Sequence, residues 1–299
     1  MKTGLFGLGL VAGLICAPAL AQRDFSDVEI RTEHVAGNVH VLYGAGGNIG
    51  VLVDEEGIVL IDDQFAPLTD RILEALKALS PGPVRFLVNT HWHGDHTGGN
   101  ENLGRQGVLI LAHDHVHERL ANPQRFENAS RNRDALPREA LPTISYNDSL
   151  SLHLGEEVRA VHYPHAHTDG DSILYFKTSN AVHMGDIFFA GRYPFIDIAS
   201  GGNLLGVIAA VADTLERIDD RVRIIPGHGE VTDRAALAAY LAMLETARDR
   251  VGAMIAEGRT LEEVKAARPM ADQDDVWGSG FINPESFLEQ VYRSLRPDN

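Results

Sequence analysis

The amino-acid sequence predicts a fold of the α+β or α/β class. Short apolar runs, rich in β-branched residues and separated by turns, occupy residues 28–62. An amphipathic helical segment and another apolar run follow them, and the same alternation of strand-like and helical segments recurs in the second half of the chain. Such alternation is typical of proteins that pack helices against β-sheets.

Composition limits the classes of protein and partner that are compatible with this chain. The chain has 299 residues, of which 44% are hydrophobic and 23% charged, as in a soluble globular protein of one large or two small domains. Its formal net charge of −16 opposes binding to nucleic acid or to an anionic membrane surface. We therefore expect a small molecule, not a nucleic acid, as its partner.

The first 21 residues have the pattern of a secretory signal peptide. A positive start at Lys2 precedes an apolar run from Leu5 to Leu14, and small residues stand before Gln22. The apolar run is short for a membrane-spanning helix, so we expect cleavage before Gln22, export to the periplasm and no membrane attachment afterwards. Cys16, the only cysteine, leaves with this segment. Any metal site must therefore be built from histidines and carboxylates.

Three short strands begin the predicted fold. They span Val39–Tyr43, Ile49–Val53 and Ile58–Ile61, and glycine-rich and acidic turns separate them. The glycines of 44–47 lack the lysine and the following helix of a phosphate-binding loop, so we interpret this segment as a hairpin turn. Thr69–Leu79 has apolar residues at helical spacing and stops at a Ser-Pro-Gly-Pro sequence, which predicts a helix.

The residues most informative about function follow a predicted buried strand at Val84–Val88. Four potential metal ligands lie within six consecutive residues: His91, His93, Asp95 and His96. Alternate side chains of an extended segment share a face, so the first two histidines can bind one metal ion together. Gly94 permits a sharp turn, which directs the aspartate and the third histidine towards a second position. Imidazole nitrogens and carboxylate oxygens suit zinc.

Further histidines follow a predicted strand at Val108–Leu111. His113, His115 and His117 stand at the start of a predicted helix that runs to about Leu120. Positions i and i+4 share a helix face, so His113 and His117 could form a third metal site. We favour the interpretation that these histidines are exposed to solvent or cap the helix.

The remaining segments continue the alternation of strands and helices. Residues 122–142 are polar, charged and proline-containing, which indicates a long surface excursion that would suit a flap beside the substrate. Ser149–Leu154 and Glu157–His162 alternate in polarity around Gly155, which predicts a β-hairpin. Helices are expected at 202–218, 233–257 and 284–295, and a capping box begins another helix at Thr260.

The sequence His-Trp-His-Gly-Asp-His at 91–96 resembles the His-x-His-x-Asp-His signature of the metallo-β-lactamase-fold hydrolases. Three downstream segments resemble the same family in the same order: Ala-His-Thr-Asp-Gly-Asp at 166–171, Gly-Asp at 185–186 and Gly-His-Gly at 227–229. The resemblance implies that residues 22–299 form a single domain with the αββα sandwich of this superfamily, in which two sheets lie face to face with helices outside.

The resemblance also implies two zinc ions per chain. It assigns His91, His93 and His167 to the first metal and Asp95, His96 and His228 to the second, and it places Asp186 as a bridge between the metals or as a ligand of the second. The resemblance further implies a catalytic role for Asp95, and it implies that Asp62 supports a metal-binding histidine from behind. His165 could compete with His167 for the first metal, but the motif favours His167 and makes His165 a neighbour that lines the site.

The activity implied by this resemblance is attack of a metal-activated water molecule on an acyl carbon. No Gly-x-Ser-x-Gly nucleophile motif occurs in the sequence. Export favours β-lactam hydrolysis, whereas an aspartate at 186 favours a lactone, ester or thioester, because zinc β-lactamases carry cysteine or serine there. We therefore predict a dinuclear zinc hydrolase of the β-lactamase-like branch. The alternatives are a lactone, ester or thioester hydrolase, a mononuclear iron oxygenase of the same fold, and a non-catalytic zinc-binding protein of the periplasm.

Overall fold

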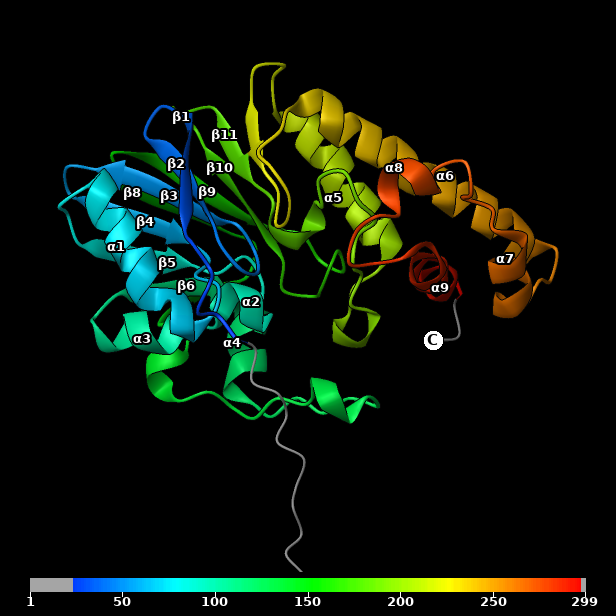
Figure 1. Cartoon of the computed structure of the whole chain (residues 1–299), viewed down its shortest axis with the longest axis horizontal. Coiled ribbons are helices and arrows are strands. Elements are labelled where there is room, and N and C mark those ends of the chain that lie inside the picture. Colours follow the sequence, from blue (N-terminus) through cyan, green and yellow to red (C-terminus); the bar gives the residue numbers. More distant parts are fainter. Residues whose placement is uncertain (1–23, 297–299) are drawn as a thin grey trace, which may run out of the picture.

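The computed structural model describes residues 24–296, so the predicted signal peptide and the cleavage site before Gln22 lie outside the described residues. Two β-sheets pack face to face, and helices cover their outer faces (Figure 1). This arrangement confirms the predicted αββα sandwich. No helix within residues 24–296 is long and apolar enough to cross a membrane.

The first sheet has seven strands in sequential order. They are β1 (Arg31–Ala36), β2 (Val39–Tyr43), β3 (Ile49–Asp54), β4 (Gly57–Ile61), β5 (Val84–Val88), β6 (Leu109–His113) and β7 (Ile144–Tyr146). Strands β1 to β4 pair antiparallel, whereas β4 to β7 run parallel.

The second sheet has five strands in the order β12-β11-β10-β9-β8. They are β8 (Ser149–Leu154), β9 (Glu156–His162), β10 (Ser172–Phe176), β11 (Ala181–His183) and β12 (Arg223–Ile225). All neighbours pair antiparallel except β11 and β12, which are parallel. The predicted hairpin around Gly155 is confirmed as β8 and β9, and this glycine has a φ of 66°, which favours a residue without a Cβ.

Three layers of apolar side chains hold the sandwich together. The side chains of β4 contribute to two of these layers, because successive side chains of a strand point to opposite faces of the sheet. Ile58 and Leu60 pack with the apolar face of a helix over the first sheet, whereas Val59 and Ile61 pack between the two sheets. A third layer joins the outer face of the second sheet to the C-terminal helices.

The helices lie mainly on the two outer faces (Figure 1). They are α1 (Thr69–Leu79), α2 (Gly94–Thr97), α3 (Asn100–Arg105), α4 (Asp114–Ala121), α5 (Leu204–Arg217), α6 (Arg234–Ala256), α7 (Leu261–Ala267), α8 (Asp274–Trp277) and α9 (Pro284–Ser294). Asp233 caps α6 by accepting a hydrogen bond from the backbone N–H of Ala236, and the predicted capping box at Thr260 is present at the start of α7.

The topology brings the functional segments to one edge of the sandwich. In the first sheet, Asp62 follows β4 and the histidine-rich segment follows the parallel strand β5. In the second sheet, β9, β11 and β12 share one direction, and His167, Asp186 and His228 follow their C-terminal ends. Loops after parallel strands meet at the same edge, so side chains from distant parts of the sequence converge there.

The structure differs from the prediction in several local features. The strand predicted at 108–111 extends to His113, so this histidine ends β6 and does not lie within the helix. The segment 181–186 was expected to be a strand that ends with Asp186, but β11 stops at His183 and Asp186 lies in a 3-10 turn at Gly185–Ile187. Strands β1, β7 and β10 were not predicted individually; β1 and β7 are edge strands, and β7 has only three residues.

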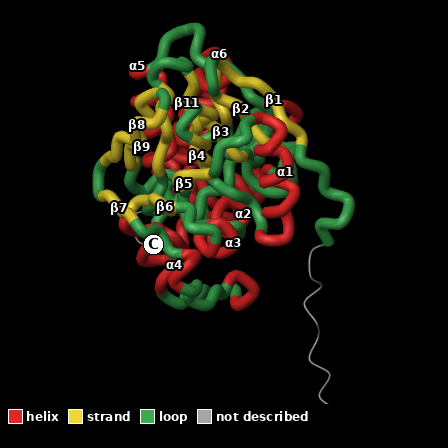
Figure 2. Tube along the Cα trace, turned by 90° about the vertical axis from the view of Figure 1, so that its left-hand side faces the viewer, coloured by secondary structure: helices red, strands yellow, loops and turns green. Residues whose placement is uncertain are grey.

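The predicted excursion at 122–142 is mostly exposed and contains two short 3-10 turns, Ala129–Arg131 and Arg138–Ala140. In Figure 2 this segment lies below α4, away from the two sheets. Leu120 and Leu136 are joined by a backbone hydrogen bond of 2.8 Å, and Gln124 pairs with Arg133 as an isolated bridge. The segment is therefore tied back on itself and held against the end of α4.

Candidate metal centre

The structure brings the seven side chains predicted as metal ligands into one cluster at the edge of the sandwich. They form two adjoining groups, and within each group one potential ligand atom per residue lies within 4.8 Å of the others. The first group contains His91, His93, His167 and Asp186, and the second contains Asp95, His96 and His228.

The first group is held by hydrogen bonds to the ring nitrogens that point away from the cluster. His91 Nδ1 lies 3.0 Å from Thr90 Oγ1, and His167 Nδ1 lies 2.7 Å from the carbonyl oxygen of Phe195. His93 turns its Nδ1 inwards, 3.0 Å from His167 Nε2, and its Nε2 lies 2.9 Å from an oxygen of Asp197. Such outer partners fix the orientation and tautomer of an imidazole, which leaves the inner nitrogen available to a metal ion.

The second group shows the same construction. His96 Nδ1 lies 2.7 Å from Asp62 Oδ2, and its Nε2 points into the cluster. His228 Nε2 lies 3.4 Å from Asp95 Oδ2, and the His228 ring stacks on Phe189 with 5.2 Å between ring centroids. Asp62 therefore lies where the resemblance expected it, behind a histidine of the cluster.

The carboxylate of Asp186 lies between the two groups. Its Oδ1 is 3.1 Å from His96 Nε2 and 3.4 Å from His228 Nε2, both of the second group. Its Oδ2 faces the first group, at 3.6 Å from His167 Nε2 and 3.9 Å from His91 Nε2. One oxygen thus faces each group, which is the placement that a bridging ligand requires.

Two loops approach closely enough that only glycine fits. A Cβ at Gly47 would collide with the ring of His96, and a Cβ at Gly227 would collide with the carboxylate of Asp186. Asn48 ties these loops together because its Nδ2 donates hydrogen bonds of 2.8 Å to the carbonyl oxygens of Pro226 and Gly229. The loop after β2 therefore helps to position His228.

Gly94 does not form the predicted sharp turn. It is the first residue of α2, its φ is not positive, and a Cβ there would meet no atom within 4 Å. The change of direction after His93 comes instead from the start of this helix, whose first turn carries Asp95 and His96 towards the second group.

The chemistry of the cluster fits divalent metal ions. Three buried polar atoms that face its centre have no hydrogen-bond partner among the described residues: His91 Nε2, His96 Nε2 and Asp186 Oδ1. Unpartnered buried polar atoms are rare in folded proteins, and metal ligands are one accepted reason for them. Nitrogen and carboxylate donors without a thiolate are a set that suits zinc.

The electrostatics of the cluster also favour bound cations. Burial lowers the pKa of His91 well below its ordinary value and that of His167 to about 4, so both imidazoles are neutral and able to bind metal. Burial also opposes the charged form of His228, but the carboxylates of Asp186 and Asp95 outweigh it and raise the pKa to about 9. These carboxylates thus attract positive charge to the second group.

An open cavity of about 520 Å³ lies over the cluster, and its lining includes His93, Asp95, Asp186 and His228. Aromatic side chains form much of its wall: Phe65, Trp92, Phe189, Tyr193, Phe195 and Phe281. Three arginines also line it: Arg131, Arg133 and Arg192. The first two of these come from the 122–142 excursion, so this segment does border the cavity, as a flap beside the substrate would.

Sequence reasoning missed two residues that support the cluster. Asp197 is 1% exposed and accepts hydrogen bonds from Ser200 Oγ at 2.6 Å and Arg131 Nη2 at 2.6 Å, besides its contact with His93. Its local sequence, Phe-Ile-Asp-Ile, contains no recognisable motif. Arg131 connects the excursion to a histidine of the cluster through this carboxylate.

The other histidines singled out in the sequence lie outside the cluster. His165 does not line the cavity as predicted, because it is exposed and its Nδ1 lies 3.0 Å from the carbonyl oxygen of Gly201. His113 caps α4 and stacks on His162 with 3.6 Å between centroids, and His117 Nδ1 lies 3.0 Å from the carbonyl oxygen of Pro142. Among the described residues, no metal-binding group contains His113, His115 or His117.

The role of Asp62 can be tested with Asp62→Asn. Asp62 has a φ of 65°, which asparagine tolerates, so the backbone is expected to survive the change. The carboxylate accepts hydrogen bonds from both the N–H and the hydroxyl of Thr90, besides His96 Nδ1. An amide replaces one acceptor by a donor, so we expect zinc affinity, measured by competition with a chelator, to fall about 10- to 100-fold.

The control for this experiment is Asp54→Asn, because Asp54 accepts a hydrogen bond from the backbone N–H of Glu56 in the turn between β3 and β4, away from the cluster. Its zinc affinity should equal that of the unmodified protein. Equal affinity in Asp62→Asn as well would show that this carboxylate does not support a metal-binding histidine.

Comparisons with known proteins agree with this architecture. The sequence profile of the family described as the Metallo-beta-lactamase superfamily matches residues 42–247. The probable metallo-hydrolase MJ0888 of Methanocaldococcus jannaschii is 27% identical over 205 residues, which are 66% of this chain and 94% of that protein. The metallo-beta-lactamase type 2 of Bacillus cereus is 23% identical over 197 residues, which are 65% of this chain and 72% of that protein.

A solved structure with the same fold is a variant of the sec-alkyl sulfatase PisA1, with a TM-score of 0.69 and 18% sequence identity. The match covers 90% of this chain and 51% of that one, so this chain spans about half of that protein. At this identity the likeness shows the fold alone. The matched range 42–247 contains the whole histidine and aspartate cluster, and the predicted resemblance is confirmed: the chain belongs to the metallo-beta-lactamase superfamily.

Proposed function

We propose that this protein is a dinuclear zinc hydrolase that cleaves an acyl C–N or C–O bond of a small molecule. The observation that carries this proposal is the convergence of seven oriented nitrogen and oxygen donors in one cluster, and four of these residues line an open cavity. His91, His93 and His167 would hold one ion, and Asp95, His96 and His228 the other, with Asp186 between them. Bound there, two zinc ions would lower the pKa of water towards neutrality and polarise an acyl oxygen.

The protein contributes position and charge to this chemistry. Asp62 and Asp197 hold the outer nitrogens of His96 and His93, so neither ring can rotate away from the cluster. Asp95 has a 28% exposed side chain and lines the cavity, so it reaches both the second group and a bound substrate. Burial raises the pKa of Asp95, but His96 and His228 outweigh it and lower the value to about 2. Asp95 is therefore a carboxylate at neutral pH and is able to bind a cation in the second group.

The choice of acyl substrate rests on two observations that point in different directions. Similarity to the metallo-beta-lactamase type 2 of Bacillus cereus favours a lactam. The oxygen donors of Asp186, buried among imidazoles where zinc β-lactamases carry cysteine or serine, favour a lactone, ester or thioester. We propose β-lactam-type amide hydrolysis as the first candidate and lactone, ester or thioester hydrolysis as the second.

A parallel hydrolysis panel tests the function. Zinc-loaded protein without residues 1–21 should hydrolyse at least one of a β-lactam, a lactone and a thioester, and the substrate with the highest kcat/KM identifies the class. Treatment with a chelator should abolish this activity, and added zinc should restore it, because the acyl bond is cleaved only when the cluster is occupied. Elemental analysis should find about two zinc ions per chain. Tight zinc binding without turnover of any acyl substrate would support the non-catalytic alternative instead.

A further inference from the structure

Part of the positive charge that lines the cavity over the metal centre has no ion-pair partner among residues 24–296 of this acidic protein. Of the three arginines that line it, Arg131 is occupied, because its Nη2 lies 2.6 Å from Asp197 Oδ2 and its guanidinium group lies over the ring of Phe126 at 4.7 Å. The other two arginines, Arg133 and Arg192, have no such carboxylate partner among residues 24–296. We call these two residues the cationic pair.

The cationic pair has no carboxylate partner within ion-pair distance among residues 24–296. Arg133 Nη1 donates only to carbonyl oxygens of its own turn, those of Ser130 at 3.3 Å and Asn132 at 2.9 Å. The stem of the Arg192 side chain packs against Gly280, because a Cβ added to Gly280 would lie 2.8 Å from the Cβ of Arg192. The chain has 42 acidic and 26 basic residues, so unpaired arginines that line one cavity indicate a site for an external anion.

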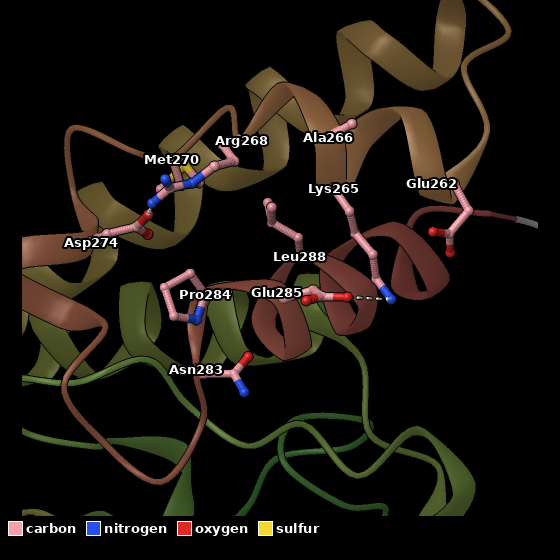
Figure 3. Close-up of a pocket in the computed structure, with 10 residues that line it drawn as sticks. All are labelled: Glu262, Lys265, Ala266, Arg268, Met270, Asp274, Asn283, Pro284, Glu285 and Leu288. Carbon is pink, nitrogen blue, oxygen red and sulfur yellow. Dashed lines mark hydrogen bonds and ion pairs between the residues drawn. The ribbon is translucent and has the colours of Figure 1, made fainter.

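A second hollow in the protein provides a comparison. It lies among α7, α8 and α9, and Figure 3 shows two basic residues there, Lys265 and Arg268. Lys265 Nζ lies 2.9 Å from Glu289 and 3.5 Å from Glu285, and Arg268 lies 2.9 Å from Asp274. These cations are neutralised within the protein, in contrast to the cationic pair beside the metal centre.

The cavity over the metal centre also has an apolar wall, which is exposed to solvent at the mouth of the cavity. Phe281 is 83% exposed, and its ring lies 6.4 Å from that of Phe195, which is itself stacked on His93 with 6.0 Å between centroids. The cavity is adjoined by a smaller hollow of about 310 Å³, and the two share Trp92, Gly94 and Arg133. The smaller hollow continues beneath the 122–142 excursion between Leu120 and Leu136.

We propose that the substrate is an anionic amphiphile, whose apolar part lies against the aromatic wall and whose anionic group, a carboxylate, sulfonate or phosphate, is bound by Arg133 and Arg192. This inference rests on the proposed function for the identity of the reacting bond, but not for the binding of the anion. Guanidinium groups bind such anions through paired, charge-assisted hydrogen bonds, and apolar contact supplies affinity without direction. The cationic pair would thus orient the substrate, with its acyl group towards the metal centre.

Binding is tested with two ligands that differ in charge, octane-1-sulfonate and octan-1-ol, by calorimetry on zinc-loaded protein. A sulfonate is chosen because it is a weaker zinc ligand than a carboxylate. We expect the sulfonate to bind more tightly than the alcohol, and its Kd to rise about tenfold in Arg133→Gln and in Arg192→Gln. The control is Arg221→Gln, because Arg221 is 89% exposed and remote from the cavity lining, and it should bind the sulfonate unchanged.

Two results would overturn the proposal. One is that the unmodified protein binds the sulfonate and the alcohol with equal affinity, or binds neither of them. The other is unchanged sulfonate affinity in the variant that carries both Arg133→Gln and Arg192→Gln. Far-UV circular dichroism of each variant establishes that the fold is retained.

Hydrolysis of two matched esters separates this inference from the proposed function. The mono-4-nitrophenyl ester of adipic acid carries a terminal carboxylate that 4-nitrophenyl hexanoate lacks. We expect the ratio of their kcat/KM values to favour the anionic ester and to fall about tenfold in each arginine variant. Ester hydrolysis with an unchanged ratio would refute the anion site and leave the hydrolase intact. Arginine-dependent sulfonate binding by a protein that hydrolyses neither these esters nor any substrate of the panel would refute the hydrolase and leave the anion site intact.

Discussion

Replacement of Asp186 by alanine is expected to lower the zinc content of the protein to about one ion per chain or fewer and to reduce kcat/KM by more than about 100-fold. Loss of a supporting partner behind a metal ligand costs about 10- to 100-fold, and Asp186 faces the cluster directly, so its loss should cost more. Its two oxygens face the two groups separately, at 3.1 Å from His96 Nε2 and 3.6 Å from His167 Nε2. Both positions would therefore be weakened by one substitution.

The same substitution also removes the negative charge that balances the second group. The carboxylate of Asp186 is the largest influence that raises the pKa of His96 and of His228, against the opposite influence of burial. Without that carboxylate, the two imidazoles lose the neighbour that makes a positive charge favourable there. Asp186→Asn retains the shape of the side chain but not its charge, and it should therefore bind less zinc than the unmodified protein and more than Asp186→Ala.

The matched control for Asp186 is Asp220→Asn, because the Asp220 side chain is 93% exposed and only a weak partner of Arg234, at 3.7 Å. Zinc content by elemental analysis and kcat/KM on the best substrate of the panel should be unchanged in this control. Two zinc ions and full turnover in Asp186→Ala would exclude this carboxylate as a bridge. Thermal unfolding of the variants, compared in the presence of a chelator, separates a loss of metal from a loss of fold.

The first half of the metal centre could be predicted because its information is local. His91, His93, Asp95 and His96 stand within six residues after an apolar run, and both the strand and the ligand chemistry can be deduced from that segment alone. His167, Asp186 and His228 lie 71 or more residues further along the chain, and only the resemblance to a family connected them with this segment. The structure then explains the connection, because these segments follow strands of common direction.

Asp197 and Arg131, which also support the cluster, could not be predicted because their contacts are distant in sequence and no motif marks them. Asp197 contacts His93 across 104 positions of sequence and Arg131 across 66, and no periodicity or motif marks it. Its role depends on the fold of the loop after Asp186, which packs with the second sheet and the C-terminal helices. Short strands at a sheet edge such as β7, with three residues, were missed because edge strands can be polar on one face and too short for a clear alternation.

The three histidines within residues 113–117 show that a high local histidine content does not by itself predict a metal site. His113 and His117 would share a face if both lay in one helix, but here β6 ends at His113 and α4 begins at the next residue. The backbone direction changes within the group, so His113 stacks on His162 while His117 reaches Pro142. Ligand spacing has meaning only together with the local backbone conformation.

Asp95→Ala and His228→Ala are expected to have similar effects, because each removes one of three residues from the second group. His228 Nε2 and Asp95 Oδ2 lie 3.4 Å apart, so both would bind the same ion. Each variant should retain about one zinc ion per chain in the first group, where His91, His93 and His167 are unchanged. We expect kcat/KM to fall by more than about 100-fold in both.

Metal content and turnover together distinguish this proposal from the single-metal alternatives. The ring of His228 stacks on Phe189, and Asn48 fixes the loop that carries His228. Because Asn48 holds this loop without the imidazole, His228→Ala should retain the native far-UV circular dichroism spectrum. A variant that binds one zinc ion and lacks activity shows that the second group is required for turnover. If both variants kept full activity with one metal ion, the reaction would need only the first group, as in a mononuclear oxygenase. The double variant with Asp95→Ala and His228→Ala should have the same kcat/KM as either single variant, whether the reaction needs two metal ions or one. It therefore does not distinguish the two hypotheses, and the single variants carry the test.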